Sequence, residues 1–162
     1  MNHYALFFDI DGTLVSFKTH EIPASAIFAL TQAKANGHRV YISTGRPVVI
    51  ITNLGAIEHL IDGFITTNGA YCFVGNDAVC CNPIPKEAVN TIVDDAQKKG
   101  YSLIVIGKTD VAVLDSKGDV DRIFRQMLAV KNLDKAQPLN VVLEQDILQL
   151  TAFFPVEYEK EL

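Results

Sequence analysis

The sequence contains few cysteines, and their pattern argues against two classes of protein. Cys72, Cys80 and Cys81 are the only three, an odd number without a Cys-x-x-Cys spacing. A disulfide framework or a zinc site would need paired or suitably spaced cysteines. We therefore expect these residues to be buried, reduced thiols.

The sequence also shows neither a signal-peptide pattern nor a membrane-spanning apolar run. The N-terminus enters an apolar run directly, without the basic region and small-residue cleavage site of a signal peptide. No apolar run approaches the length of about 20 residues that a helix needs to cross a bilayer. We therefore expect a cytoplasmic protein with no membrane partner.

Positive charge is scarce as well. The 14 Lys and Arg residues are outnumbered by 19 Asp and Glu residues, which gives a formal net charge of −5 at pH 7. No basic cluster stands out, so we expect no nucleic-acid partner. Hydrophobic residues make up 49% of the chain and charged residues 20%, a balance that is typical of a folded protein with a buried core.

Two acidic residues follow the first apolar run. Residues 4–8 (Tyr-Ala-Leu-Phe-Phe) predict a strand buried on both faces, as in a parallel sheet. Asp9 and Asp11 come at its carboxyl end, where residues two apart in an extended chain point to the same side. Gly12 permits a sharp turn after them. A solvated turn is the simpler alternative, but the pattern favours a catalytic pair.

The next segments alternate between helix and strand patterns. Pro23 suits the first turn of a helix that runs to about residue 36, and Gly37 suits the position just after it. A strand at residues 39–42 leads to Ser43-Thr44-Gly45-Arg46-Pro47, and Pro47 again predicts the start of a helix.

A third strand is predicted at residues 64–66, followed by Thr67-Asn68-Gly69-Ala70. The order β-α-β-α-β with short connections predicts a parallel sheet with right-handed crossovers. Ligands of such sheets bind outside the carboxyl ends of the strands. The candidate site residues at those ends are Asp9, Asp11, Thr44, Gly45, Arg46 and Asn68.

The second half of the chain has a different pattern. A hairpin over residues 71–74 and 78–81 is followed by a linker at residues 82–85. We predict helices at residues 86–99 and 120–130, and strands at residues 103–106, 111–114, 139–143 and 147–154. This indicates a separate α+β unit with an antiparallel sheet and helices on one face. The expected domains are residues 1–82 and 83–162.

The paired acids are suited to phosphoryl transfer, in which catalysis depends on positioning and on neutralising charge. Asp9 would be the nucleophile that forms an aspartyl phosphate, and Asp11 the general acid and then the general base. Two carboxylates and an anionic substrate call for a cation, and Mg²⁺ fits oxygen ligands. Asp9 would bind it through its carboxylate, and Asp11 through its backbone carbonyl or its carboxylate.

The remaining candidates would hold the phosphate. Thr44 could donate its hydroxyl, and Gly45 its backbone N–H at a helix start, although both also fit a helix cap. Ile10 and Gly12 could donate backbone N–H groups in the same way. Arg46 could contact phosphate or substrate and Asn68 could orient either, but a solvated arginine and an ordinary Asn-Gly turn are equally good interpretations.

These motifs resemble a known family. Asp9-Ile10-Asp11-Gly12-Thr13 is similar to the first motif of the haloacid dehalogenase (HAD) superfamily. Thr44-Gly45-Arg46-Pro47, with Thr67-Asn68-Gly69-Ala70, resembles its Cof-type phosphatases. The resemblance implies a Rossmann-like α/β core, an α+β cap after the third core strand, and Mg²⁺-dependent hydrolysis of a small phosphorylated metabolite, often a sugar phosphate.

The resemblance also implies two motifs that do not occur in these 162 residues: a lysine and a Gly-Asp-rich stretch ending in Asn-Asp. We therefore expect an incomplete core and an incomplete cap, as in the N-terminal part of a protein about 100 residues longer. Two alternatives stay open at this point. One is a truncated, inactive fragment that at most binds phosphate or a partner chain, and the other is a phosphomutase with the same aspartyl phosphate. The substrate and the oligomeric state stay open as well.

Overall fold

The structure is a computed structural model that describes residues 2–116, 120, 122 and 136–154. The chain separates into two compact units, Met1–Asn82 and Pro83–Leu162. Each unit has its own sheet and its own hydrophobic core.

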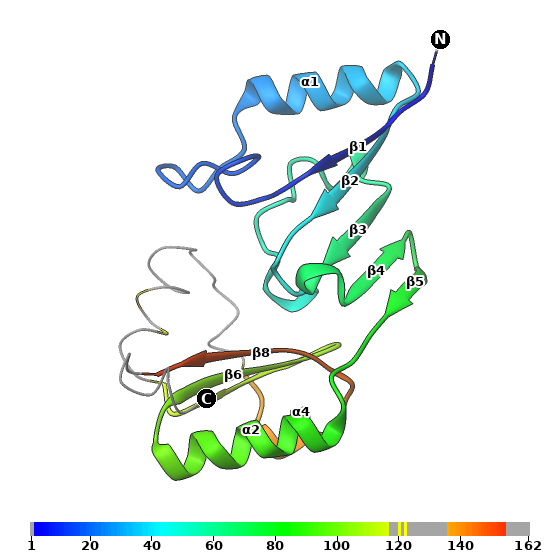
Figure 1. The fold of residues 1–162 in the computed structure, drawn as a ribbon. Coiled ribbons are helices and arrows are strands. Elements are labelled where there is room, and N and C mark those ends of the chain that lie inside the picture. Colours follow the sequence, from blue (N-terminus) through cyan, green and yellow to red (C-terminus); the bar gives the residue numbers. More distant parts are fainter. Residues whose placement is uncertain (1, 117–119, 121, 123–135, 155–162) are drawn as a thin grey trace. The chain divides into compact units, whose positions relative to one another are not determined.

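The first unit is built on a five-stranded sheet, drawn from blue to green in Figure 1. Its strands are neighbours in chain order, and the first three run parallel, as the alternating sequence pattern predicts. The predicted hairpin is present and extends the same sheet antiparallel to the third strand. The strands are β1 (Ala5–Phe8), β2 (Arg39–Ser43), β3 (Gly63–Thr66), β4 (Tyr71–Val74) and β5 (Asp77–Cys81).

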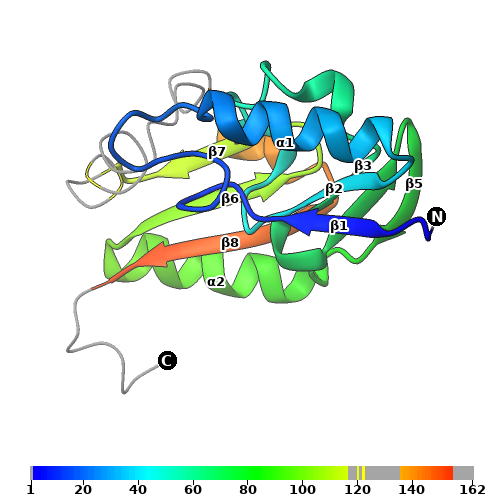
Figure 2. The same ribbon diagram turned by 90° about the horizontal axis from the view of Figure 1, so that it is seen from above.

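Helix α1 (Ala24–Ala35) covers one face of this sheet, as Figure 2 shows from above. It begins after Pro23, as predicted, and the chain turns away through Gly37, whose φ of 81° is readily adopted only by glycine. Leu30 from the helix packs into a core with the sheet residues Val40 and Ile42, both fully buried. This packing holds α1 against the strands that lead to the loops after β1 and β2.

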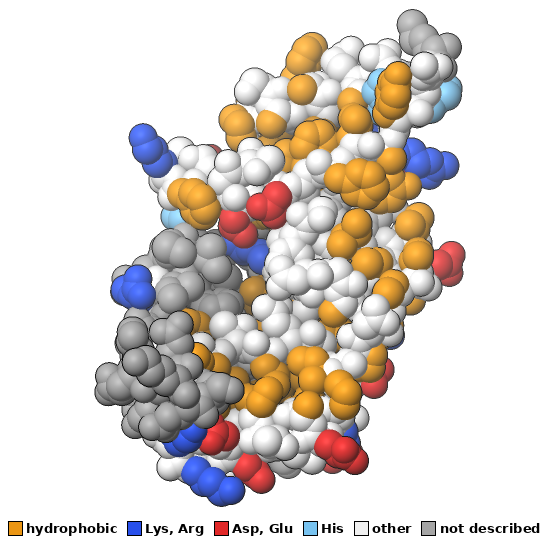
Figure 3. All heavy atoms as spheres, viewed as in Figure 1, with side chains coloured by type: hydrophobic (Ala, Val, Ile, Leu, Met, Phe, Trp, Pro, Cys, Tyr) orange, Lys and Arg blue, Asp and Glu red, His pale blue; other side chains and the backbone are white. Residues whose placement is uncertain are grey.

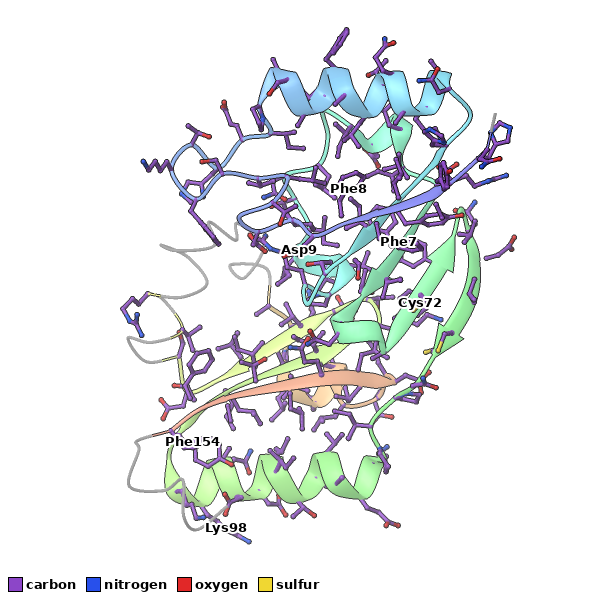
Figure 4. All side chains as sticks on the ribbon, turned by 45° about the horizontal axis from the view of Figure 1, so that its top comes forward. Phe7, Phe8, Asp9, Cys72, Lys98 and Phe154 are labelled. Atoms are coloured by element: carbon purple, nitrogen blue, oxygen red, sulfur yellow. The ribbon has the colours of Figure 1, made fainter. Side chains whose placement is uncertain are left out.

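The opposite side of β1 is open in the described residues, which corrects the prediction of a strand buried on both faces. Phe8 lies between β1 and α1, whereas Phe7 lies on the other side of the strand (Figure 4) and stacks on Tyr41. Phe7 remains 55% exposed. Figure 3 shows hydrophobic side chains gathered over the strands of this unit.

The helix predicted after Pro47 is also wrong. Only two single turns of 3₁₀ helix form in this segment, η1 (Val48–Ile50) and η2 (Glu58–Leu60). Residues 48–52 are Val-Val-Ile-Ile-Thr, and β-branched side chains lose rotamer freedom in a helix. The apolar spacing still serves a purpose, because Leu54, Ile57 and Leu60 are buried in the core below α1.

The second unit contains a three-stranded antiparallel sheet in the order β7-β6-β8, formed by β7 (Val111–Leu114), β6 (Ser102–Gly107) and β8 (Ile147–Phe153). Helix α2 (Lys86–Lys99) and the short α4 (Leu139–Val142) lie on one face of it (Figure 1). The core between them contains Val89, Val93, Ala96, Leu103, Val105 and Val142. The α+β architecture predicted from the sequence is present in this unit.

Two elements predicted for this unit are not found as predicted in the described residues. The segment predicted as a strand at residues 139–143 forms α4, because Pro138 suits a helix start and the apolar residues Leu139, Val142 and Leu143 recur at helical spacing. The predicted helix at residues 120–130 lies outside the described residues except for positions 120 and 122. Among the helices that the structure describes, none is long and apolar enough to span a membrane.

The three cysteines are free and half-buried rather than fully buried. Cys72 and Cys80 are cross-strand partners in the β4–β5 hairpin. Burial, together with the neighbouring Cys80, raises the pKa of the Cys72 thiol. Cys72 is therefore held in its protonated, less reactive form.

Asp62 joins three parts of the first unit at the amino ends of the strands. Its carboxylate accepts hydrogen bonds from Lys34 Nζ of α1 (2.6 Å) and from the Val40 N–H of β2 (2.7 Å). Its backbone carbonyl accepts the Gly75 N–H at the hairpin turn. Burial alone would raise the pKa of Asp62, but Lys34, Val40 and Arg39 outweigh that effect and hold the pKa below its ordinary value.

We predict that Asp62→Asn lowers the free energy of unfolding by about 1–2 kcal/mol at pH 7, because a charge-assisted pair is lost. A carboxylate with a lowered folded pKa stabilises the protein above its unfolded pKa, near 3.8, and loses that effect as the pH falls. The difference from wild type should therefore shrink below about pH 4. Urea unfolding at several pH values measures it, with the exposed Asp77→Asn as the control. An equal deficit at pH 3 and pH 7 would contradict the assignment.

Candidate active site

The loop after β1 places the first two candidate residues. β1 ends at Phe8, and Ile10 already lies in a turn, so this loop, rather than strand alternation, positions the acids. The carbonyl of Ile10 accepts the N–H groups of Thr13, Leu14 and Val15, which closes the loop tightly. Asp9 is exposed at its entrance (Figure 4), and Ile10 is fully buried beneath it.

Gly12 is required by the shape of this loop. Its φ is 75°, and a Cβ atom at this position would lie 2.7 Å from the ring of Phe17. Any other residue would therefore be strained and would displace the aromatic ring. The Gly12 N–H donates to the Val15 carbonyl (2.9 Å), so its contact with a phosphate stays a prediction.

The loop after β2 carries Thr44, Gly45 and Arg46. Thr44 is 5% exposed, its N–H donates to the Ile65 carbonyl of β3, and its Oγ1 accepts the Arg46 N–H at 3.1 Å. A threonine hydroxyl has one hydrogen to donate. Because Oγ1 already accepts from the backbone, this hydrogen is the part of the hydroxyl suited to contact an anion.

The loop after β3, which includes the 3₁₀ turn η3 (Thr67–Gly69), is joined to the loop after β2. The Thr67 N–H donates to the Arg46 carbonyl (3.1 Å), and the Asn68 N–H donates to the Thr44 carbonyl (3.4 Å). Thr67 and Asn68 both adopt left-handed backbone angles, with φ near 54° and 53°. Asparagine tolerates the left-handed region, whereas a β-branched threonine is strained there.

The side chain of Asn68 lies over Gly45. A Cβ atom built on Gly45 would be 2.9 Å from Asn68 Oδ1, so only glycine lets the amide take this place without a shift. Asn68 is exposed, as is Gly45, and both could therefore meet a ligand.

An ion pair links the first two loops. Arg46 donates from Nε to Asp11 Oδ2 and from Nη2 to Asp11 Oδ1, both at 2.7 Å. The arginine side chain is 5% exposed and that of Asp11 is 21% exposed. This paired geometry is the strongest form of an arginine–carboxylate contact.

The structure thus connects most of the candidate residues through direct contacts within the first unit. Asp11 contacts Arg46, Arg46 contacts Thr44, and Gly45 lies against Asn68. Asp9 stands apart, because its carboxylate has no hydrogen bond or ion pair with the described residues. Sequence reasoning missed the pairing of Arg46 with Asp11 and the roles of Phe17 and Thr67, for which no sequence signal exists.

Comparison with known proteins shows the family of the chain. The family model of haloacid dehalogenase-like hydrolases matches residues 6–162. The chain belongs to this family. In Bacillus subtilis (strain 168), the protein named "Putative phosphatase YkrA" is 28% identical over 109 residues, which are 67% of this chain and 41% of that protein.

Solved structures of HAD proteins have the same fold. BT4131, described as a HAD subclass IIB sugar phosphatase, is 43% identical with a TM-score of 0.84, over 98% of this chain and 61% of its own. A structure from work on a trigonal-bipyramidal intermediate in a phosphoryl-transfer superfamily is also 43% identical, with a TM-score of 0.86 over 97% and 60%. BT1666 from Bacteroides thetaiotaomicron, at 24% identity and a TM-score of 0.75, covers 100% of this chain and 59% of its own and shares the fold.

These matches extend the earlier resemblance in one respect and limit it in another. The first unit is the parallel-sheet part of a HAD core, and the similarity to the subclass IIB protein BT4131 covers 98% of the chain. However, it spans only 41% of the curated relative and about 60% of the solved structures.

We predict that Gly45→Ala weakens binding of inorganic phosphate to the complete protein about fivefold, because it displaces Asn68 and loses about one hydrogen bond. The melting temperature should change little, since the clashing atom is the end of a flexible side chain. Calorimetric titration measures the affinity.

Gly55→Ala is the matched control, because nothing lies within 4 Å of a Cβ atom there. Equal phosphate affinities for the two variants would show that Asn68 does not contact the ligand.

Proposed function

We propose that the complete protein hydrolyses a small phosphate monoester, in particular a sugar phosphate, through an aspartyl phosphate on Asp9. One observation carries the proposal: Asp9 is exposed and without a partner among the described residues, beside an Asp11 that is held in place. A nucleophile must be free to reach the phosphorus atom, and an acid–base group must be oriented.

The two acids divide the chemistry. An Asp9 oxygen attacks phosphorus, and the bond from phosphorus to the ester oxygen breaks as Asp11 gives that oxygen a proton. Asp11 then takes a proton from a water molecule, which attacks the aspartyl phosphate. Inorganic phosphate leaves, and both carboxyl groups return to their starting states.

Neighbouring groups would bind the transferred phosphate. The Thr44 hydroxyl has its hydrogen available, and the exposed Gly45 N–H and the Asn68 amide are further donors on the adjoining loops. The buried side chain of Ile10 anchors the loop after β1 in the core. Its backbone N–H stays a candidate donor to the phosphate. These donors would stabilise the negative charge of the phosphoryl group during transfer.

The oxygen atoms at the start of the β1 loop suit Mg²⁺, although no group of three or more His, Cys, Asp or Glu in the described residues forms a complete metal site. We propose that Asp9 would bind the ion through its carboxylate and Asp11 through its backbone carbonyl, because the Asp11 carboxylate faces the guanidinium of Arg46. When bound, Mg²⁺ would reduce the repulsion between the Asp9 carboxylate and the phosphate.

The substrate class rests on the similarity to BT4131, described as a sugar phosphatase. The second unit would then act as the cap that selects the sugar. A phosphomutase would share the aspartyl phosphate but return the group to a sugar, so phosphate release distinguishes the two. The cytoplasmic location stays a prediction.

We predict that Asp9→Asn lowers phosphate release by the complete protein at least about a thousandfold, because the amide cannot attack phosphorus. A colorimetric phosphate assay over a set of sugar phosphates with Mg²⁺ measures it. The melting temperature should stay close to that of wild type, since the Asp9 carboxylate has no partner in the described structure.

Asp94→Asn, an exposed position on α2, is the control and should keep full activity. Turnover by Asp9→Asn at the wild-type rate would exclude Asp9 as the nucleophile. Assay of residues 1–162 alone beside the complete protein tests the alternative of an inactive fragment.

A further inference from the structure

Arg46 is fixed at every part of its length. Its N–H donates to Thr44 Oγ1, its carbonyl accepts the Thr67 N–H, and Nη1 donates to the Ile50 carbonyl at 3.4 Å. Nε and Nη2 both donate to the Asp11 carboxylate. The side chain is buried, so it cannot swing between alternative partners without leaving this network.

We propose that Arg46 is the positioning residue of Asp11 and not a phosphate ligand. The inference rests on the proposed function of Asp11 in proton transfer. The planar guanidinium fork fixes the plane of the Asp11 carboxylate, so that the same oxygen faces the leaving group in the first step and the water in the second.

The carboxylate can be held and still exchange a proton. Each ionised oxygen has two lone-pair sites, and the two hydrogen bonds from Arg46 occupy one on each oxygen. A further site on each oxygen is left for proton transfer. Without the fork, Asp11 could rotate on a loop whose backbone turns sharply at Gly12.

A role in binding phosphate is disfavoured by the same geometry. The forked edge of the guanidinium is already committed to the Asp11 carboxylate by two hydrogen bonds of 2.7 Å, and turning that edge to a phosphate would leave a partly buried carboxylate without its counter-charge. Separating a buried pair is costly because the remaining charge is poorly solvated. The exposed Gly45 N–H and Asn68 amide would meet a phosphate without this cost.

A lysine at this position keeps the charge but loses the fork, which makes Arg46→Lys the informative variant. In the complete protein we expect it to lower kcat for glucose 6-phosphate about tenfold to a hundredfold with little change in KM, as misorientation of a catalytic group does. For p-nitrophenyl phosphate, whose leaving group needs no proton, formation of the aspartyl phosphate should change less than about threefold.

A double-mutant cycle with Asp11→Asn tests whether the two residues act together. If Arg46 works only through Asp11, adding Arg46→Lys to Asp11→Asn should lower kcat by less than about twofold. Effects that multiply, or a KM about tenfold higher with kcat retained, would overturn the proposal and indicate direct binding of the substrate.

Two further measurements separate a specific role of Arg46 from a general effect of an Arg→Lys substitution and from failure of the proposed function. Arg39→Lys, at the other end of β2 and 65% exposed, is the matched control and should keep wild-type kinetics. Binding of inorganic phosphate with Mg²⁺ does not depend on turnover, and the proposal expects equal affinity for wild type and Arg46→Lys. Weaker binding by the variant would overturn it, whereas a wild-type protein that binds phosphate normally but releases none would count against the proposed function alone.

Discussion

The ion pair between Arg46 and Asp11 is the contact on which the arrangement of the site depends. It joins the loops after β1 and β2, and the backbone of Arg46 in turn holds the loop after β3. One buried arginine thus links the loops that follow three strands. It also balances one of the two neighbouring carboxylates, so the negative charge that remains at the site is that of Asp9.

The sheet makes this pairing possible. The parallel strands β1, β2 and β3 end at the same edge of the sheet. Helix α1 packs against the sheet through the core that contains Leu30, Val40 and Ile42. Asp62 ties the opposite ends together. Asp62 and the candidate site therefore lie at opposite ends of the same strands, so a substitution at one end can leave the other unchanged.

The sequence predicts those parts of the fold that local patterns determine. Helix α1 follows from Pro23 and Gly37 at its ends, and the strands follow from short apolar runs. The failures have local causes too. The β-branched run after Pro47 opposes a helix, and the short apolar segment at Leu139–Val142 fits either structure until Pro138 is weighed. The partner of Arg46 could not be predicted, because 35 residues separate it from Asp11 and only tertiary packing brings them together.

The left-handed backbone of Thr67 lowers the stability of the fold and gives the loop after β3 its shape. A left-handed β-branched residue costs about 1–3 kcal/mol, and Thr67 is also almost completely buried. The consequence concerns protein engineering: replacing this residue by glycine would relieve the strain but give the loop more freedom when unfolded. The melting temperature of a variant at position 67 would therefore be a poor guide to whether the loop after β3 keeps its left-handed backbone.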